Sequence, residues 1–156
     1  MAASLKAGRF VVPFGAFSAM SHPGVYRTVT NPLMYNMGRR VGPVGPLPPV
    51  LAMPVAAEGV DIHCQSRLRE DWNATFDLFA VNGLQGDEPA LFNDSRRYTD
   101  NNREPAFGGR ATVGSSCLRF GGSVMSGNLA DDGLNSLHCK LAGVDVTARC
   151  ADLLRF

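Results

Sequence analysis

Hydrophobic and polar residues alternate one by one along several stretches of this 156-residue chain. The most regular stretch is VDIHCQSRL, from Val60 to Leu68. Because successive side chains of a β-strand point to opposite faces of a sheet, this alternation predicts strands with one apolar and one polar face. We expect strands in residues 4–15, 60–68, 74–84, 107–114, 118–125 and 137–149, and a truncated seventh strand in the terminal DLLRF.

The alternation also assigns each side chain to a face of the predicted sheet. One face is expected to carry the apolar residues Val60, Ile62, Phe76, Leu78, Phe107, Val113, Leu118 and Phe120. The opposite face is expected to carry the polar residues Asp61, His63, Gln65, Arg67, Asp77, Arg110 and Arg119. The pattern therefore predicts a sheet that separates apolar from charged side chains.

The connections between these stretches alternate in length. A Pro-rich loop at 16–58 and a polar loop at 84–105 are long, whereas REDWN and SSC are short enough to allow only hairpins. Short turns at one end, long loops at the other and strands of about nine to eleven residues are typical of outer-membrane barrels. We therefore predict one all-β domain over residues 1–156, an antiparallel up-and-down meander that forms a partial, unclosed transmembrane β-barrel with long loops.

Several motifs resemble those of porin-like bacterial outer-membrane proteins. LKAGRFVVPFGAFSAMSHP is similar to the GRF-x-x-PFG strand and loop start of these proteins. LFAVNGLQGD, YTDNNREPAFGGRATVG and LRFGGSVMSGN resemble a later part, in which a DNN loop leads into a GGR strand and then into a Gly-rich strand. LAGVDVTARCADLLRF resembles the next hairpin. The resemblance covers most of the chain outside the Pro-rich loop.

This resemblance implies a barrel wall in the bacterial outer membrane, in contact with lipid, that lets small solutes or ions pass without an energy source. The pore-lining candidates are Arg9, Asp61, His63, Gln65, Arg67, Asp77, Arg110, Arg119 and Asp145. Arg110 is expected to be an unpaired charge that stays hydrated in the lumen. Porin-like proteins carry a signal peptide and more strands. Because MAASLKAGRF lacks the apolar core of a signal peptide, we expect the chain to represent part of a longer protein.

The alternation is also compatible with a soluble antiparallel β-sandwich, such as a glycan-binding or cell-surface module. The apolar residues distinguish the two, because they face lipid in a barrel and a packed core in a sandwich. In the barrel interpretation, an open sheet leaves unpaired edges and an uncovered apolar face. We therefore expect the isolated chain neither to conduct nor to remain a soluble monomer, but to aggregate, to require detergent or to pair its edges in a homo-oligomer.

Composition and charge narrow the function classes. A net charge of +1 provides no basic field for nucleic acid, and no run of 18 apolar residues predicts a membrane-spanning helix. Ser115 and Ser116 do not form a nucleophile elbow, and Asp94, Asp131 and Asp132 lie in polar loops where turn formation explains them. We expect neither catalytic activity nor a cofactor.

Two His-Cys dipeptides, His63-Cys64 and His138-Cys139, are the only feature that suggests a metal site. Both lie in alternating stretches, where neighbouring side chains point to opposite faces and one dipeptide cannot supply two ligands to one ion. Ordinary strand residues are the favoured interpretation, and a site formed by histidines of two neighbouring strands remains the alternative.

Overall fold

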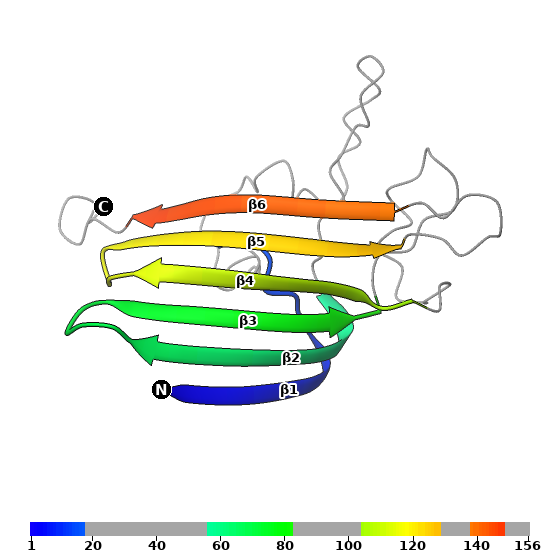
Figure 1. Ribbon diagram of the computed structural model, residues 1–156, viewed down its shortest axis with the longest axis horizontal. Coiled ribbons are helices and arrows are strands. Elements are labelled where there is room, and N and C mark those ends of the chain that lie inside the picture. The colour runs from blue at the N-terminus through cyan, green and yellow to red at the C-terminus, as the bar shows by residue number, and fades with distance from the viewer. Residues whose placement is uncertain (18–55, 83–103, 129–137, 149–156) are drawn as a thin grey trace, which may run out of the picture.

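Six strands lie side by side in one sheet in a computed structural model of the chain, which describes residues 1–17, 56–82, 104–128 and 138–148 (Figure 1). The strands are β1 (Ala2–Val11), β2 (Ala56–Arg67), β3 (Asn73–Val81), β4 (Ala106–Gly114), β5 (Leu118–Asn128) and β6 (His138–Ala148). Most of the Pro-rich and polar loops, and the seventh strand expected at DLLRF, fall outside the described residues.

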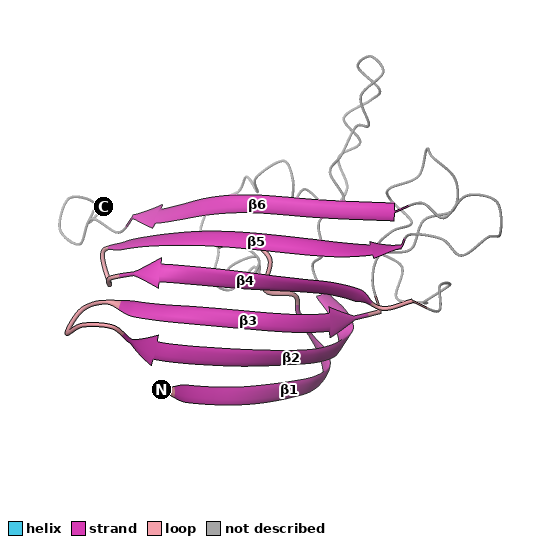
Figure 2. Cartoon of the chain, viewed as in Figure 1, coloured by secondary structure: helices cyan, strands magenta, loops and turns pink. Residues whose placement is uncertain are grey.

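Each strand pairs with the next in an antiparallel arrangement, in the order β1-β2-β3-β4-β5-β6. The all-β meander predicted from the alternation is therefore confirmed, and the sheet is not closed into a barrel. All regular elements in the described ranges are strands, as Figure 2 shows. Within those ranges, no helix has the length and hydrophobicity needed to cross a membrane.

The two ends of the sheet differ in their connections. At the turn end, β2 joins β3 through residues 68–72 and β4 joins β5 through residues 115–117. At the loop end, where β1, β3 and β5 finish, the connections span 12–55, 82–105 and 129–137. The predicted sorting of short and long connections is confirmed for these six strands.

The first two strands have different limits from those expected. β1 ends at Val11 instead of continuing to Gly15, because Pro13 has no N–H for a sheet ladder and the Phe14 N–H donates to the Val12 carbonyl at 2.8 Å, which closes a tight turn. β2 begins at Ala56, inside the segment assigned to the Pro-rich loop. Its first residues show no clear alternation, but they pair with the end of β1, and this tertiary pairing makes them strand.

The register confirms the predicted faces, because residues that pair directly share a face. His63 pairs with Asp77, which pairs with Arg110, and all three lie on what we call the polar face. Ile62 pairs with Leu78 on the opposite, apolar face. The polar face also holds Asp61, Gln65, Arg67, Arg119 and Asp145, and the apolar face holds Val60, Phe76, Phe107, Val113, Leu118 and Phe120.

Arg9 is the exception among the pore-lining candidates. It pairs with Glu58, one position away from Gly59, which shares the face of Asp61. Arg9 therefore lies on the apolar face, and its place among the pore-lining candidates, which requires the polar face, is wrong. The register of β1 follows from its pairing with the unexpected first residues of β2, so the alternation within β1 alone was insufficient to place Arg9.

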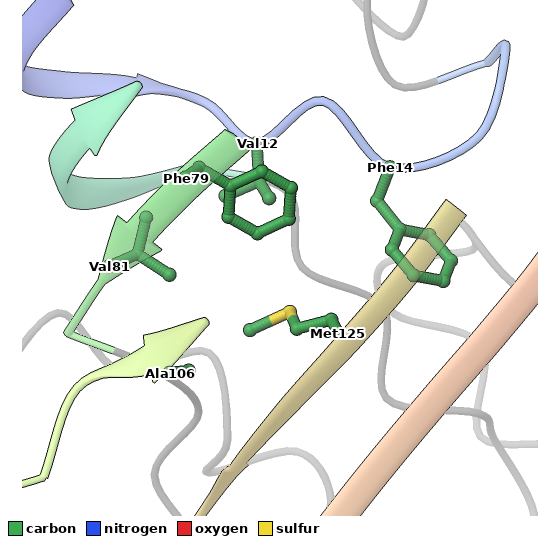
Figure 3. Close-up of a cluster of buried hydrophobic side chains, with 6 residues drawn as sticks. All are labelled: Val12, Phe14, Phe79, Val81, Ala106 and Met125. Carbon is green, nitrogen blue, oxygen red and sulfur yellow. The ribbon is translucent and has the colours of Figure 1, made fainter. Parts of the chain in front are cut away.

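The hydrophobic core lies on the polar face at the loop end, not on the apolar face. Phe79, Val81, Ala106 and Met125 point from β3, β4 and β5 toward Val12 and Phe14, which belong to the segment after β1 (Figure 3). This segment, residues 12–17, passes across the polar face, and we call it the strap. The strap reaches β6 at the far edge of the sheet, because a Cβ added at Gly143 would lie 3.4 Å from the Phe14 ring.

Candidate functional site

Three contacts between basic and acidic side chains cross the middle of the polar face. The Lys6 Nζ lies 3.0 Å from Asp61 Oδ2, the His63 Nδ1 lies 2.6 Å from Asp77 Oδ1, and Arg110 contacts Asp145. These six residues come from β1, β2, β3, β4 and β6. The site is therefore built by strand pairing, which brings basic and acidic side chains together on neighbouring strands or across one intervening strand, and not by any short sequence motif.

Arg110 and Asp145 form the pair with the most hydrogen bonds. The two guanidinium nitrogens Nη1 and Nη2 donate to the two carboxylate oxygens at 2.7 and 2.8 Å, a bidentate geometry that is stronger than a single ion contact. Nη1 also donates to the Ser123 hydroxyl at 2.9 Å, and Arg110 is only 8% exposed. The expectation that Arg110 is an unpaired hydrated charge is wrong, because the register brings Asp145 within its reach.

Gly121 makes room for this ion pair. Arg110 and Asp145 lie on β4 and β6, so their side chains meet above β5, and Asp145 pairs directly with Gly121. A Cβ at Gly121 would lie 2.6 Å from Asp145 Oδ2 and 2.7 Å from Arg110 Nη2. The absence of a side chain at position 121 is therefore what allows a salt bridge to span an intervening strand.

We expect Gly121→Ala to lower the free energy of unfolding by about 2 kcal/mol, since the added methyl displaces one or both charged groups from the bidentate geometry. Gly122→Ala is the matched control, because a Cβ there meets no heavy atom within 4 Å. Denaturant unfolding of both variants in the same detergent measures the difference between their free energies of unfolding. Equal midpoints for the two variants would show that the space at Gly121 is not required.

The strap is attached to the same ion pair through Ser123. The Ser123 hydroxyl accepts the Gly15 N–H at 3.0 Å as well as the Arg110 donor, and Ser123 is buried. Gly15 has a φ of 70°, a left-handed conformation that glycine adopts without strain. One hydroxyl therefore connects the strap, which covers the loop end, to the charged middle of the sheet.

A polar cavity of about 690 Å³ lies between the strap and the turn end. Pro13 and Gly15 of the strap form one side, and Thr75 and Thr112 form part of the floor, with their hydroxyls 2.6 Å apart. The other polar lining residues are His63, Glu70, Asp71, Asn73, Asp77, Arg110, Ser115, Ser116, Arg119 and Thr147. The lining therefore presents hydroxyls, an amide and charges of both signs to the cavity.

The candidate residues contribute to this space in different ways. His63, Asp77, Arg110 and Arg119 line the cavity. Asp61 is fully buried beside Lys6, and one of its oxygens, Oδ1, has no hydrogen-bond partner among the described residues. Gln65 and Arg67 are exposed on the polar face toward the turn end. Asp145 lies next to the cavity through its contact with Arg110, whereas Arg9 lies on the other face.

Several residues that shape the site were missed from the sequence. Lys6, Gly121 and Ser123 hold or permit the ion pairs, and Thr75 and Thr112 form the hydroxyl contact. Thr75 and Thr112 occupy polar-face positions in their alternating strands, so the alternation could have placed them among the pore-lining candidates. Gly121 and Ser123 could not be found in this way, since their roles depend on contacts between β4, β5 and β6.

The other candidate chemistries have structural explanations. The Ser115 hydroxyl accepts the backbone N–H groups of Cys117 and Leu118 at 3.3 and 3.2 Å, which stabilises the turn between β4 and β5. His63 and Cys64 point to opposite faces, and His63 binds Asp77. No group of three or more His, Cys, Asp or Glu side chains in the described segments is arranged to hold a metal ion.

The apolar face is open to its surroundings over its whole width. Its large side chains Val60, Ile62, Phe76, Leu78, Phe107, Val113, Leu118, Phe120 and Val124 are each 38–60% exposed. A shallow hollow of about 680 Å³ lies over the small residues Cys64, Ala74, Ala111 and Gly122, between Phe76 and Phe120. The sheet thus combines an exposed apolar face with an ion-paired polar face.

No family model matches the chain, and comparisons with curated proteins and with solved structures give no match.

Proposed function

We propose that this chain forms part of the wall of a porin-like β-barrel in the bacterial outer membrane, through which small solutes or ions pass without an energy source. Lipid contacts the apolar face and water fills the space above the polar face. The porin-like motifs of the sequence support this assignment, and the geometry of the sheet supports it independently.

The observation that carries the proposal is the position of the strap. In a protein folded in water, a segment that crosses a sheet covers the apolar face, because burying apolar surface stabilises the fold. Here the strap lies on the polar face, where the ion pairs are, and it leaves the apolar face uncovered. This arrangement is the one expected of a sheet whose apolar face contacts lipid.

The paired charges indicate weak selectivity. The cations Lys6 and Arg110 each have a carboxylate partner, so the middle of the polar face carries both signs in close proximity. Rings of charge of one sign make a pore selective, and alternating signs cancel at short range. We therefore assign passage of small polar solutes or ions with little preference for charge.

The purified chain is expected to bind lipid vesicles and to lack a monomeric state in water. After dilution from denaturant it should float with vesicles in a density gradient, and without lipid or detergent it should elute from a size-exclusion column as large aggregates. A sharp monomer peak in water with a cooperative melt, together with failure to float, would contradict the proposal. That outcome would favour the soluble β-sandwich with a glycan-binding or cell-surface role.

A further inference from the structure

The outer sides of the two edge strands, β1 and β6, pair with no other described strand, and the directions of these two strands allow them to pair with each other. Among the described strands, β1 pairs only with β2 and β6 pairs only with β5. Every neighbouring pair is antiparallel, so in a sheet of six strands the first and the last run in opposite directions. The β6 edge of one copy can therefore pair with the β1 edge of a second copy and continue the same antiparallel meander.

The membrane restricts how two copies can meet. Pairing β6 with β1 keeps the loop ends of both copies on one side and keeps their apolar faces continuous. Pairing like edges, β1 with β1 or β6 with β6, would place the loop end of one copy beside the turn end of the other if the strands were antiparallel. If they were parallel, it would turn the apolar face of one copy to the opposite side of the sheet, away from lipid. Because outer-membrane barrels keep short turns on one side and long loops on the other, only the β6-to-β1 pairing is compatible with lipid.

The side chains along the two edges select one register. On the polar face, placing Lys6 of one copy opposite Asp145 of the next also places Ser4 opposite Thr147 and Phe10 opposite Leu141. The Lys6 side chain is 56% exposed and uses one contact to Asp61, so its ammonium retains donors for a second carboxylate. Across the junction, the polar face would then carry Asp61, Lys6, Asp145 and Arg110 in this order, with charges of alternating sign.

The apolar face supports the same register. Leu5 on β1 is 71% exposed, and Val144 and Val146 on β6 are 92% and 62% exposed, higher values than those of the large apolar side chains in the middle strands. The register that pairs Lys6 with Asp145 places Leu5 opposite Val146 and Ala7 opposite Val144. Apart from Met1, the most exposed large apolar side chains are thus the ones that a second copy would contact.

We propose that copies of this chain assemble through the edges of the sheet, with β6 of one copy paired antiparallel to β1 of the next in the register that places Asp145 opposite Lys6. This inference rests on the proposed membrane function, and it identifies the partner as a second copy of the chain. Two six-stranded sheets contribute twelve strands, an even number within the range of bacterial barrels. Such an assembly removes the open edges that a single copy would expose to lipid.

Disulfide trapping tests the register. In a chain whose native cysteines are replaced by serine, Ser4→Cys with Thr147→Cys places two thiols directly opposite each other, at a Cα separation of about 5 Å that suits a disulfide. Ser4→Cys with Val146→Cys is the matched control, because Val146 is adjacent in sequence and lies on the opposite face. Both variants are refolded in detergent, oxidised and compared on non-reducing gels.

We expect covalent dimers or larger closed species for Ser4→Cys with Thr147→Cys (the 4/147 pair). We expect none for Ser4→Cys with Val146→Cys (the 4/146 pair). Equal cross-linking of both pairs, or no cross-linking of either, would overturn the proposal. A disulfide formed within one chain would also overturn it, since that requires β1 and β6 of the same copy to meet. The unaltered chain offers an independent measurement: sedimentation equilibrium in density-matched detergent should give a multiple of the monomer mass, and a monomer would contradict the proposal.

The failure of this proposal can be separated from the failure of the proposed function. Flotation of the chain with vesicles in the absence of the 4/147 cross-link would leave the membrane assignment standing and remove the edge pairing. Cross-linking of the 4/147 pair without flotation would overturn the membrane function and show that the edges pair in water.

Discussion

Replacing Asp145 with asparagine is expected to lower the free energy of unfolding by about 3 kcal/mol, the low end of the range for breaking a buried ion pair by removing one partner. The Arg110 guanidinium would keep its position at 8% exposure but would lose the charge that compensates it. The amide of asparagine can accept only one of the two hydrogen bonds that the carboxylate accepts, at 2.7 and 2.8 Å. The loss therefore exceeds that expected for a surface charge.

Asp71→Asn provides the comparison, because Asp71 is an exposed carboxylate in the turn between β2 and β3. Denaturant unfolding in detergent, followed by circular dichroism, gives both values. The double variant Arg110→Gln with Asp145→Asn should lose less than the sum of the single changes, since it leaves no uncompensated charge. If Asp145→Asn and Asp71→Asn have equal effects, the bidentate pair does not stabilise the sheet.

The alternation of residues was enough to predict the sheet, its topology and the face of most side chains. Residues 60–68 and the shorter stretches 74–78 and 107–113 alternate so regularly that a shift of one residue would exchange both faces, and the register shows no such shift. The short turns REDWN and SSC then required neighbouring strands to form hairpins. Local pattern and turn length together determine an antiparallel meander.

The contacts of the site could not be predicted in the same way. Arg110 and Asp145 are separated by 35 residues and by one intervening strand, so their contact depends on the registers of β4 with β5 and of β5 with β6. The abundance of Val and Phe in residues 4–15 predicts a strand that includes the first part of the strap, residues 12–15. Its path across the polar face depends on the turn at Pro13 and on the bond between Gly15 and Ser123.

Replacing Leu78 with arginine is expected to weaken insertion into vesicles by about 2–4 kcal/mol, the cost of an arginine facing lipid near the bilayer midplane. Leu78 lies in the middle part of β3 on the apolar face and is 49% exposed. In a protein whose apolar face is in water, an exposed leucine is replaced by arginine with a change of about 0.5 kcal/mol or less. The size of the effect therefore distinguishes lipid from water around this face.

Gln65→Arg adds the same charge on the polar face and is the matched control, since Gln65 is exposed and pairs with Thr75, which lines the polar cavity. Flotation with vesicles over a range of urea concentrations gives the free energy of insertion for each variant. We expect Gln65→Arg to behave like the parent chain. Equal insertion of Leu78→Arg and Gln65→Arg would mean that the apolar face does not contact lipid.

The environment of the two faces can be measured directly with spin labels on single cysteines in vesicle-bound chains. Labels at Phe76, Leu78 and Val124 lie on the apolar face, and labels at Gln65, Thr75 and Thr147 lie on the polar face. The proposed wall predicts that lipid-soluble oxygen relaxes the first set more than a water-soluble nickel chelate does, and that the order reverses for the second set. Equal access of the nickel chelate to both sets would contradict a sheet that separates lipid from water.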